Sequence, residues 1–326
     1  MEFIKPDINI NFVAYRRIAM AISGLVVIAS IVAVLVVGFN FGIEFAGGIE
    51  MRVKVSDNVT AKDLRAALSE LGLNNAIVNE YVDLVNVYSI KLKGSELEDK
   101  IHRANESEPE AVTTGKKLQA DAANVLIDSL TQKFGKGHLE VVSTDMIGSR
   151  VGETLRIRGI QAILASLIAM LIYIGIRFNF RYAPGAVVAL AHDVIIVTGL
   201  MVLMHREFTL SVIAALLTIA GYSINDTIIV FDRIREAQGL SRGQMLPTVV
   251  NRAINQTLSR TILTSATTLV VVVALFILGG EILRDFALAM ILGIGVGTYS
   301  SIFIASPIFI ELEEIFAARK PKAKRR

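Results

Sequence analysis

A carboxylate stands inside an apolar stretch of the chain. The segment 209–236, TLSVIAALLTIAGYSINDTIIVFDRIRE, carries Asn225 and Asp226 before its apolar run is complete, and ionic residues return only at Asp232. On insertion scales, a carboxylate in the hydrocarbon core of a membrane costs about 2.5–3.5 kcal/mol. Asp226 therefore needs a polar partner, a proton or water. An acid that loads and releases a proton at this depth can draw on the membrane potential, which supplies about 2.3 kcal/mol per charge and 100 mV.

Three more ionisable residues stand near apolar runs. His192 and Asp193 interrupt the run 184–204, and Arg260 begins a later one. In helices that cross a membrane alternately, Asp193 would lie about 15 Å and Asp226 about 9 Å from the inner end, at 1.5 Å per residue. The Arg260 side chain is long enough to reach inward from the inner boundary. We expect these residues to meet in the inner half of the bilayer if their helices are neighbours.

Two interpretations of these polar residues compete. In the first they are packing devices: Asn225 and Asp226 hydrogen-bond to adjacent helices, and Arg260 extends to the interface. In the second, Asp226 carries a proton: a dry site favours the protonated acid, whereas water or the approach of Arg260 favours the carboxylate. His192 fits helix packing as well as a proton relay.

The composition indicates a polytopic membrane protein. The chain has 326 residues, of which 53% are hydrophobic, and its mean hydropathy is +0.57, too apolar for an ordinary soluble protein of this size. The first apolar run is about twenty residues long and lacks a small-residue cleavage site, so we interpret it as a retained helix and not as a signal peptide. Six membrane-spanning helices are predicted, over residues 18–37, 159–176, 184–204, 209–231, 260–278 and 286–310.

The basic residues predict the orientation. Lys and Arg flank the first helix in the lead 1–17, recur in each loop on the same side, and fill the tail 311–326. By the positive-inside rule both termini are cytoplasmic, and the region 38–158 lies outside. The cationic tail is typical of a cytoplasmic flank; binding to anionic membrane lipid or to ribosomal RNA is the alternative.

A small α+β domain with its connectors is predicted over residues 38–158. Apolar alternation from Ile49, a capped helix over 60–71, two strands of a hairpin around Asp83, a helix over 116–134 and a final strand from Leu139 follow the order β-α-β-β-α-β. That order is typical of a ferredoxin-like fold. Nothing in the domain looks catalytic, so we expect it to bind or to gate.

Several kinds of chemistry are excluded by what the sequence lacks. There is no cysteine, which excludes disulfides, thiol nucleophiles and thiolate-bound metals, and the four histidines show no metal-binding spacing. No P-loop, nucleophile elbow or HExxH motif occurs. We therefore predict neither enzyme activity nor a cofactor, a metal or a nucleic-acid partner.

Glycines mark two further places. Gly42, Gly47 and Gly48 follow the first helix, where they permit a tight turn or a flexible exit from the membrane. Gly221 in the fourth predicted helix, and Gly293, Gly295 and Gly297 in the sixth, permit close helix contact.

Together these motifs resemble the SecF family of protein-export membrane subunits. The segment 41–48, FGIEFAGG, is similar to the family's glycine signature, and 221–236, GYSINDTIIVFDRIRE, matches its fourth-helix motif almost letter for letter. The segments 141–152, 190–197, 258–268 and 283–307 also match. The signature positions carried over are Phe41, Gly42, Gly47, Gly48, Gly221 and Tyr222. The departures are small, such as Glu44 where Asp is usual.

The resemblance implies half of a transporter of the resistance–nodulation–division type: six helices and one external ferredoxin-like domain, with a SecD-like subunit supplying the other half. It implies proton transfer at Asp226 and Arg260, with Asn225 beside them, and less directly at Asp193 and His192. The implied function is to couple the proton-motive force to late steps of protein export, with the Sec translocation channel and exported unfolded polypeptides as partners, in the bacterial inner membrane.

Two alternatives remain open. One is a proton-coupled small-molecule efflux transporter of the same superfamily, and the other is a scaffold whose buried charges only hold helices together. Efflux relatives usually duplicate the six-helix unit and carry two large external domains, so a single unit with one small domain favours export.

Overall fold

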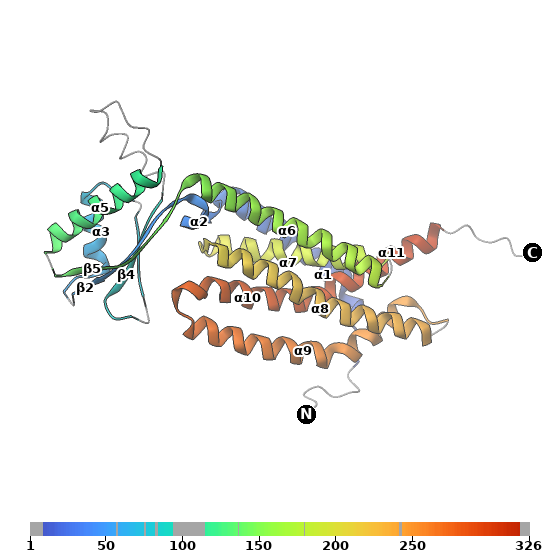
Figure 1. Ribbon diagram of the computed structural model, residues 1–326. Coiled ribbons are helices and arrows are strands. Elements are labelled where there is room, and N and C mark those ends of the chain that lie inside the picture. Colours follow the sequence, from blue (N-terminus) through green and yellow to red (C-terminus); the bar gives the residue numbers. More distant parts are fainter. Residues whose placement is uncertain are drawn as a thin grey trace, which may run out of the picture.

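The chain forms a small α+β domain attached to one end of a long helical bundle (Figure 1). The structure is a computed structural model and describes residues 9–56, 58–74, 76–81, 84–93, 115–135, 137–178, 180–240 and 243–319. The domain is inserted between the first and second long helices of the bundle. We call it the sheet domain, and we name the two ends of the bundle the domain end and the far end.

The sheet domain has the predicted ferredoxin-like topology. Its antiparallel strands lie in the spatial order β3-β4-β2-β5. In the described part of the chain they are β2 (Gly48–Val55), β3 (Ile77–Glu80), β4 (Val87–Lys93) and β5 (Leu139–Ile147), with the helices α3 (Ala61–Glu70) and α5 (Gly115–Phe134). The turn expected around Asp83 and most of the charged segment 93–115 lie outside the described residues.

The two faces of this sheet differ because strand side chains alternate. Ile49, Met51 and Val53 of β2 are fully buried against α3 and α5 in one apolar core. Glu50 and Arg52 point to the opposite face, which we call the open face. The helices therefore cover one side of the sheet and leave a polar side free.

The first helix of the domain begins at a capping box. Thr60 accepts a hydrogen bond from the Asp63 backbone N–H, and the Asp63 carboxylate accepts one from the Thr60 N–H. The hydrogen bonds from Thr60 hold the pKa of Asp63 below its usual value. This reciprocal pair satisfies two helix-terminal donors and explains why the helix starts where the sequence predicts.

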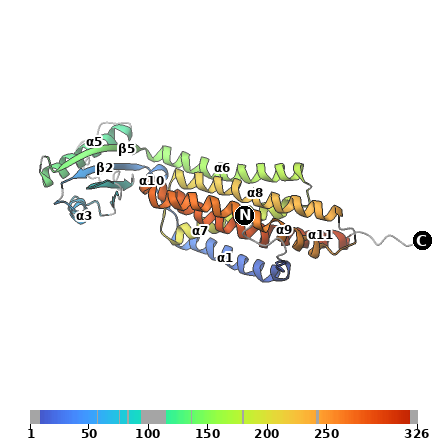
Figure 2. The same ribbon diagram turned by 90° about the horizontal axis from the view of Figure 1, so that it is seen from below.

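The bundle contains six helices long and apolar enough to cross a membrane, counted over the described residues. The chain is thus a multi-pass membrane protein. Its helices are α1 (Arg16–Val37), α6 (Ser149–Arg177), α7 (Ala183–Leu203), α8 (Leu210–Leu240), α9 (Leu246–Leu278) and α10 (Gly280–Ser300). α8 packs against α6, α7, α9 and α10, whereas α1 packs mainly on α7 (Figures 1 and 2). α8 therefore occupies the centre of the helical bundle.

Several helices are longer than the apolar runs indicate. α6 begins ten residues before the predicted 159, and α8 continues nine residues beyond 231. The segment before 260, expected to be a separate amphipathic stretch, is continuous with α9, which begins at Leu246 with Pro247 in its first turn. Hydropathy locates the part of a helix that lies in lipid, but a helix ends at its cap and not at the membrane boundary.

The sixth span is interrupted near its middle. α10 passes into a π-helical turn, Ser301–Ala305, and then into α11 (Ser306–Arg319), which extends beyond the predicted end at 310. The Ser306 hydroxyl donates to the Ser301 carbonyl oxygen at 3.0 Å. Single π-turns of this kind are frequent at functional sites.

The glycine signature forms a tight turn and not a flexible exit. β1 (Asn40–Phe41) pairs with β6 (Glu207–Phe208), and α2 (Ile43–Ala46) is a single helical turn closed by Gly47 with φ +72°. A Cβ at Gly152 of α6 would lie 2.8 Å from the Phe45 carbonyl oxygen. The signature therefore fixes the sheet domain closely against the start of α6.

Candidate functional site

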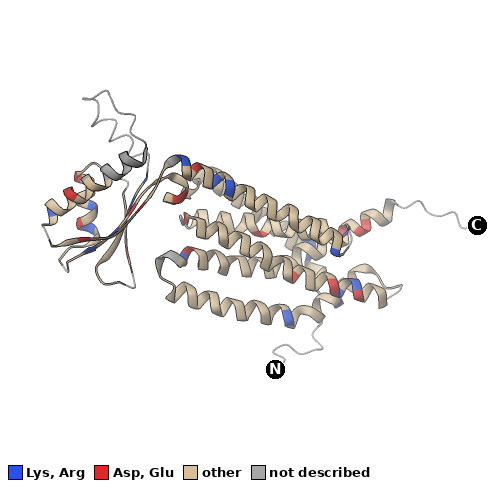
Figure 3. Cartoon of the chain, in the orientation of Figure 1, with Lys and Arg blue, Asp and Glu red and all other residues tan. Residues whose placement is uncertain are grey.

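Two carboxylates lie in the middle of the bundle. Asp193 on α7 has no exposed surface, and Asp226 on α8 is 1% exposed. The centre of α8 brings them close together, because Ser223 contacts Asp193 and lies one helical turn before Asp226. Charged residues are otherwise concentrated at the ends of the bundle and on the sheet domain (Figure 3). A buried acid pair in an apolar bundle is the strongest candidate for chemistry in this chain.

Both oxygens of Asp193 have polar partners. Its Oδ2 accepts from the Ser223 hydroxyl on α8 and, at 2.7 Å, from the Ser300 hydroxyl at the end of α10. Its Oδ1 lies 2.8 Å from Nδ1 of His192. These three polar contacts satisfy both oxygens of a carboxyl group that is out of reach of water. Asp193 thereby links α7, α8 and α10.

Asp226 has far fewer contacts. Its Oδ2 lies 3.5 Å from the Ser265 hydroxyl on α9, which is a long hydrogen bond. Its Oδ1 is buried and has no partner among the described residues. Leaving an ionised oxygen unpaired in a dry interior is costly, whereas a proton on the carboxyl group removes the charge. The geometry around Asp226 therefore suits an acid that holds a proton, whereas both oxygens of Asp193 already have polar partners.

A short chain of hydroxyl groups adjoins Asp226. Ser265 lies 2.7 Å from the Thr298 hydroxyl of α10 and accepts a long hydrogen bond, 3.4 Å, from the Tyr222 hydroxyl. Thr261, one turn before Ser265, has a buried hydroxyl without a partner in the described part of the chain. Ser265, which contacts Asp226, is thus hydrogen-bonded in turn to hydroxyl groups on α8 and α10.

Both acids lie between two apolar clusters. One cluster fills the bundle toward the domain end and includes Val212, Leu216 and Ile219 of α8. The other fills the far end and includes Val230 and Phe231. A Cβ at Gly293 would lie 2.3 Å from Ile219, so α8 and α10 touch closely in the first cluster. The acids are thus separated from both ends of the bundle by packed side chains.

His192 joins this centre to a groove on the surface of the bundle. The side chain is 6% exposed, and its Nε2 has no partner among the described residues. It lines an apolar groove of about 510 Å³ between α1 and α10, beside Tyr299. The Tyr299 hydroxyl lies 3.0 Å from that of Ser23 on α1.

Arg260 and Asn225 do not meet Asp226 in this structure. Both side chains are exposed on the bundle surface, and Arg260 has no carboxylate within 4 Å among the described residues. Arg260 lies near the middle of α9, and its side chain does not point toward α8 as Thr261 and Ser265 do, because each residue turns a helix by about 100°. Gly221 shares the exposed face of α8 with Asn225, and a Cβ there would touch nothing within 4 Å.

The sequence analysis did not identify the hydroxyl groups that surround the acids. They are Ser223, Ser265, Thr298 and Ser300. A signal was present, because hydroxyl residues in spanning helices hydrogen-bond across helices. Serine and threonine also bond to the preceding turn of their own helix, however, so periodicity alone does not separate the two uses.

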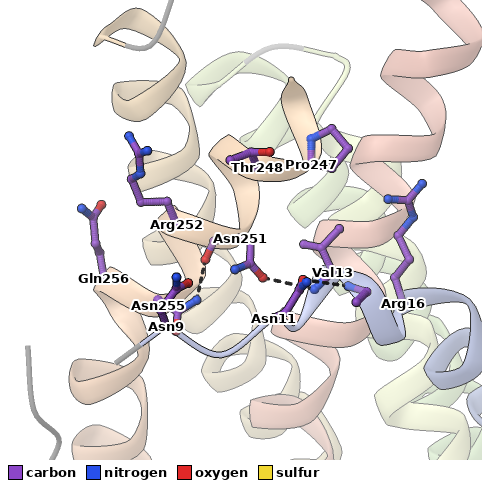
Figure 4. Close-up of a pocket in the computed structure, with 11 residues that line it drawn as sticks. Asn9, Asn11, Val13, Arg16, Pro247, Thr248, Asn251, Arg252, Asn255 and Gln256 are labelled. Atoms are coloured by element: carbon purple, nitrogen blue, oxygen red, sulfur yellow. Dashed lines mark hydrogen bonds between the residues drawn. The ribbon is translucent and has the colours of Figure 1, made fainter. Parts of the chain in front are cut away.

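A polar pocket of about 630 Å³ lies at the far end (Figure 4). Asn255 donates to the Ile10 carbonyl oxygen and accepts from the Ile10 N–H, both at 2.8 Å. Asn251 accepts from the Val13 N–H at 3.2 Å. The two asparagines hold the segment before α1 across the start of α9. No group of side chains that could hold a metal ion occurs in the residues described.

Comparison with known proteins identifies the family. Residues 126–315 match the family described as protein export membrane protein SecD/SecF, C-terminal, and residues 32–59 match the SecD/SecF GG motif. The chain belongs to the SecD/SecF protein-export family. Protein translocase subunit SecF of Rhodothermus marinus is 40% identical over 99% of both chains, and that of Thermodesulfovibrio yellowstonii is 41% identical over 93% of this chain and 95% of its own.

The SecD/SecF relationship extends to solved structures. The crystal structure of SecDF from Thermus thermophilus, described as a translocon-associated membrane protein, superposes with a TM-score of 0.74 and 36% identity. The match covers 97% of this chain and 40% of that one. The family's fold, six spanning helices with a small α+β domain, is therefore the fold of this chain, whose similarity to SecF extends over almost its whole length.

Proposed function

We propose that this chain is the SecF-like subunit of a translocase accessory complex and couples the proton-motive force to late steps of protein export, with Asp226 as the proton carrier. The observation that carries the proposal is the contrast between the two buried acids: both oxygens of Asp193 have polar partners, whereas Asp226 Oδ1 has none in the described structure. A carboxyl group that is buried without partners is stable only when it is protonated or reached by water.

The apolar clusters on either side give this site an occluded state. A proton on Asp226 cannot exchange with either end of the bundle while both clusters stay packed. Export would then require the helices around α8 to open first toward one end and then toward the other. The π-turn after Ser300 supports such motion. Ser300 is the last residue of α10 before the turn, and its hydroxyl donates to Asp193, so a change in the turn would be felt at the buried acids.

Arg260 is proposed to act in a second arrangement of α9. It stands one residue from Thr261 and about one and a half helical turns from Ser265, so a rotation of α9 by roughly 100° would turn it toward α8. An arginine beside Asp226 favours the carboxylate and would release the proton. Asn225, on the adjoining exposed face, would contribute a hydrogen bond at the same stage.

The proposed setting is the bacterial inner membrane, with both termini cytoplasmic and the sheet domain outside. Arginines near the far end, such as Arg177, Arg181 and Arg233, support this orientation. The proposed partners are a SecD-like subunit, the Sec translocation channel and exported unfolded polypeptide. The exposed side chains of Asn225 and Arg260 support a SecD-like partner, because polar groups on the outer surface of spanning helices need a polar partner in lipid.

The test replaces Asp226 with Asn in the assembled complex and measures export of a secreted precursor with and without a proton-motive force. We expect the variant to lose the part of export that depends on the proton-motive force while the complex still assembles. The matched control is Asp232→Asn, an exposed acid on the same helix. Unchanged proton-dependent export in Asp226→Asn would show that Asp226 is not the carrier.

A further inference from the structure

A polar cleft of about 660 Å³ lies between the sheet domain and the domain end of the bundle. The open face of the sheet forms one wall, with Glu50, Arg52 and Lys91. The opposite wall comes from α2, from the turn between α7 and α8, and from the start of α10. The proton site described above is separate from this cleft, because the apolar cluster at the domain end lies between them.

Two arginines of this cleft have donors that the described residues leave unused. The Nε atoms of Arg52 and Arg206 are both buried without a hydrogen-bond partner. The terminal nitrogens of the two side chains also lack close partners: Arg52 Nη2 lies 3.9 Å from Asp145 Oδ2, and Arg206 Nη1 lies 3.7 Å from Asp285 Oδ1, both beyond hydrogen-bond distance. The two side chains are 33% and 39% exposed and line the cleft, so their guanidinium groups can take a further acceptor from a ligand there.

The charges of the cleft restrict the chemistry of that ligand. Five carboxylates line it: Glu44, Glu50, Asp145, Glu207 and Asp285. Four cationic residues also line the cleft, Arg52, Lys91, Arg206 and Arg284, so charges of both signs are interspersed along it. A phosphate or a free carboxylate would be repelled by the five carboxylates. A neutral acceptor that also offers donors, as the peptide backbone does, suits arginines and carboxylates together.

We propose that this cleft binds an extended segment of exported polypeptide, whose backbone carbonyl groups accept from Arg52 and Arg206 and whose backbone N–H groups donate to the surrounding carboxylates. Apolar side chains on the two walls, Ile43 of α2 and Ile77 of β3, would contact the side chains of that segment. Contact mainly through the backbone suits clients of different sequence. This inference rests on the proposed function, because it takes an exported chain as the substrate.

The junction can accept such a segment without coming apart. Lys91 of β4 and Glu207 of β6 form an ion pair at 2.7 Å across the cleft floor, and Lys93 donates to Asn40 at 3.2 Å. These contacts hold the sheet domain on the bundle independently of the two arginines. The cleft is therefore fixed in shape before a ligand arrives, which reduces the ordering cost of binding.

The test uses two neighbouring residues of β3 that point to opposite faces of the sheet. A photo-crosslinking amino acid replaces Asn79, which lines the cleft, or Glu80, which is exposed on the other side. The full complex in membranes is irradiated while a translocation-arrested precursor is being exported. We expect the precursor to crosslink at position 79 and not at position 80.

Charge-retaining variants then test the arginines. The double variant Arg52→Lys, Arg206→Lys keeps both positive charges but removes the forked guanidinium donors. At a sub-saturating precursor concentration it should lower the yield of the precursor crosslink at position 79 about tenfold. Arg150→Lys, an exposed arginine away from the cleft, should leave it unchanged. Equal yields at 79 and 80, an adduct to a partner subunit alone, or a yield unaffected by the paired lysine variants would contradict the proposal.

The same crosslink in the Asp226→Asn background separates the two claims. Binding in the cleft needs no proton cycle, so the adduct at position 79 should persist while proton-dependent export is lost. If export requires Asp226 but no precursor reaches position 79, the cleft proposal alone fails. If the adduct forms but Asp226→Asn exports normally, the proton coupling alone fails.

Discussion

The ion pair between Lys91 and Glu207 should be a principal attachment of the sheet domain to the bundle. The two side chains are only 19% and 14% exposed, and the charged atoms are 2.7 Å apart. Burial alone lowers the pKa of Lys91, but Glu207 more than offsets that effect and leaves the pKa above the ordinary value. The contribution of the pair is therefore fully present below the pKa of lysine in the unfolded chain. It is lost as the pH rises through the higher pKa of the folded protein.

The magnitude follows from distance and burial. With an effective dielectric constant of about 20, two charges 2.7 Å apart attract by about 6 kcal/mol. Desolvation of both groups offsets much of this attraction, and removing one partner of a buried pair costs about 3–5 kcal/mol. Because both side chains keep some contact with solvent, we expect about 2–3 kcal/mol for Lys91→Met or for Glu207→Gln, and a coupling free energy of about 1–2 kcal/mol.

Hydrogen exchange of the β4 and β6 amides measures this directly. Exchange in the two single variants and the double variant gives the free energy of local opening, and the double-mutant cycle gives the coupling. The control pair is Lys133 and Glu70 within the sheet domain, whose side chains are 37% and 70% exposed and should couple by less than about 1 kcal/mol. A coupling for Lys91 and Glu207 no larger than that of the control would refute the reasoning.

Two further predictions concern packing and pH. Gly199→Ala should destabilise the bundle by about 1–3 kcal/mol, because the new Cβ would lie 2.4 Å from the Cβ of Ser30 on α1. A Cβ added at Gly24 would meet no atom within 4 Å, so the control Gly24→Ala should be neutral. Thermal unfolding in lipid nanodiscs compares the two variants. Burial raises the pKa of Glu44, so ionisation opposes folding above that pKa and the penalty disappears as the pH falls. Glu44→Gln should therefore raise the unfolding temperature at neutral pH and have no effect at a pH below the pKa of glutamate in the unfolded chain; an equal effect at both would argue against this origin.

The topology was predictable because it depends on periodicity and helix length. The alternation from Ile49 and the cap at Thr60 define the sheet domain, and six apolar runs define the bundle. The ends of α6, α8 and α9 were not predictable, because a polar stretch outside the lipid can either continue a helix or form a loop. The π-turn Ser301–Ala305 has no sequence signal that we can identify.

The candidate site was predictable in part, for a related reason. A lone acid in an apolar run stands out, so Asp193 and Asp226 could be selected from the sequence, and both are buried in the bundle; their part in proton transfer stays a prediction. Which way a helix faces depends on its neighbours, and an error of one residue turns a side chain by about 100°. Arg260 therefore lies on the exposed surface near the middle of α9, and the conformation in which it acts stays a prediction.

The central claim is that Asp226 gains and loses a proton inside the bundle. Infrared difference spectroscopy of the complex in lipid, recorded through a pH titration, observes the carboxylic acid C=O band of a protonated aspartate. The account predicts a titrating band that is absent from Asp226→Asn and retained in Asp193→Asn. A band that survives in Asp226→Asn, or one that is lost only in Asp193→Asn, would contradict it.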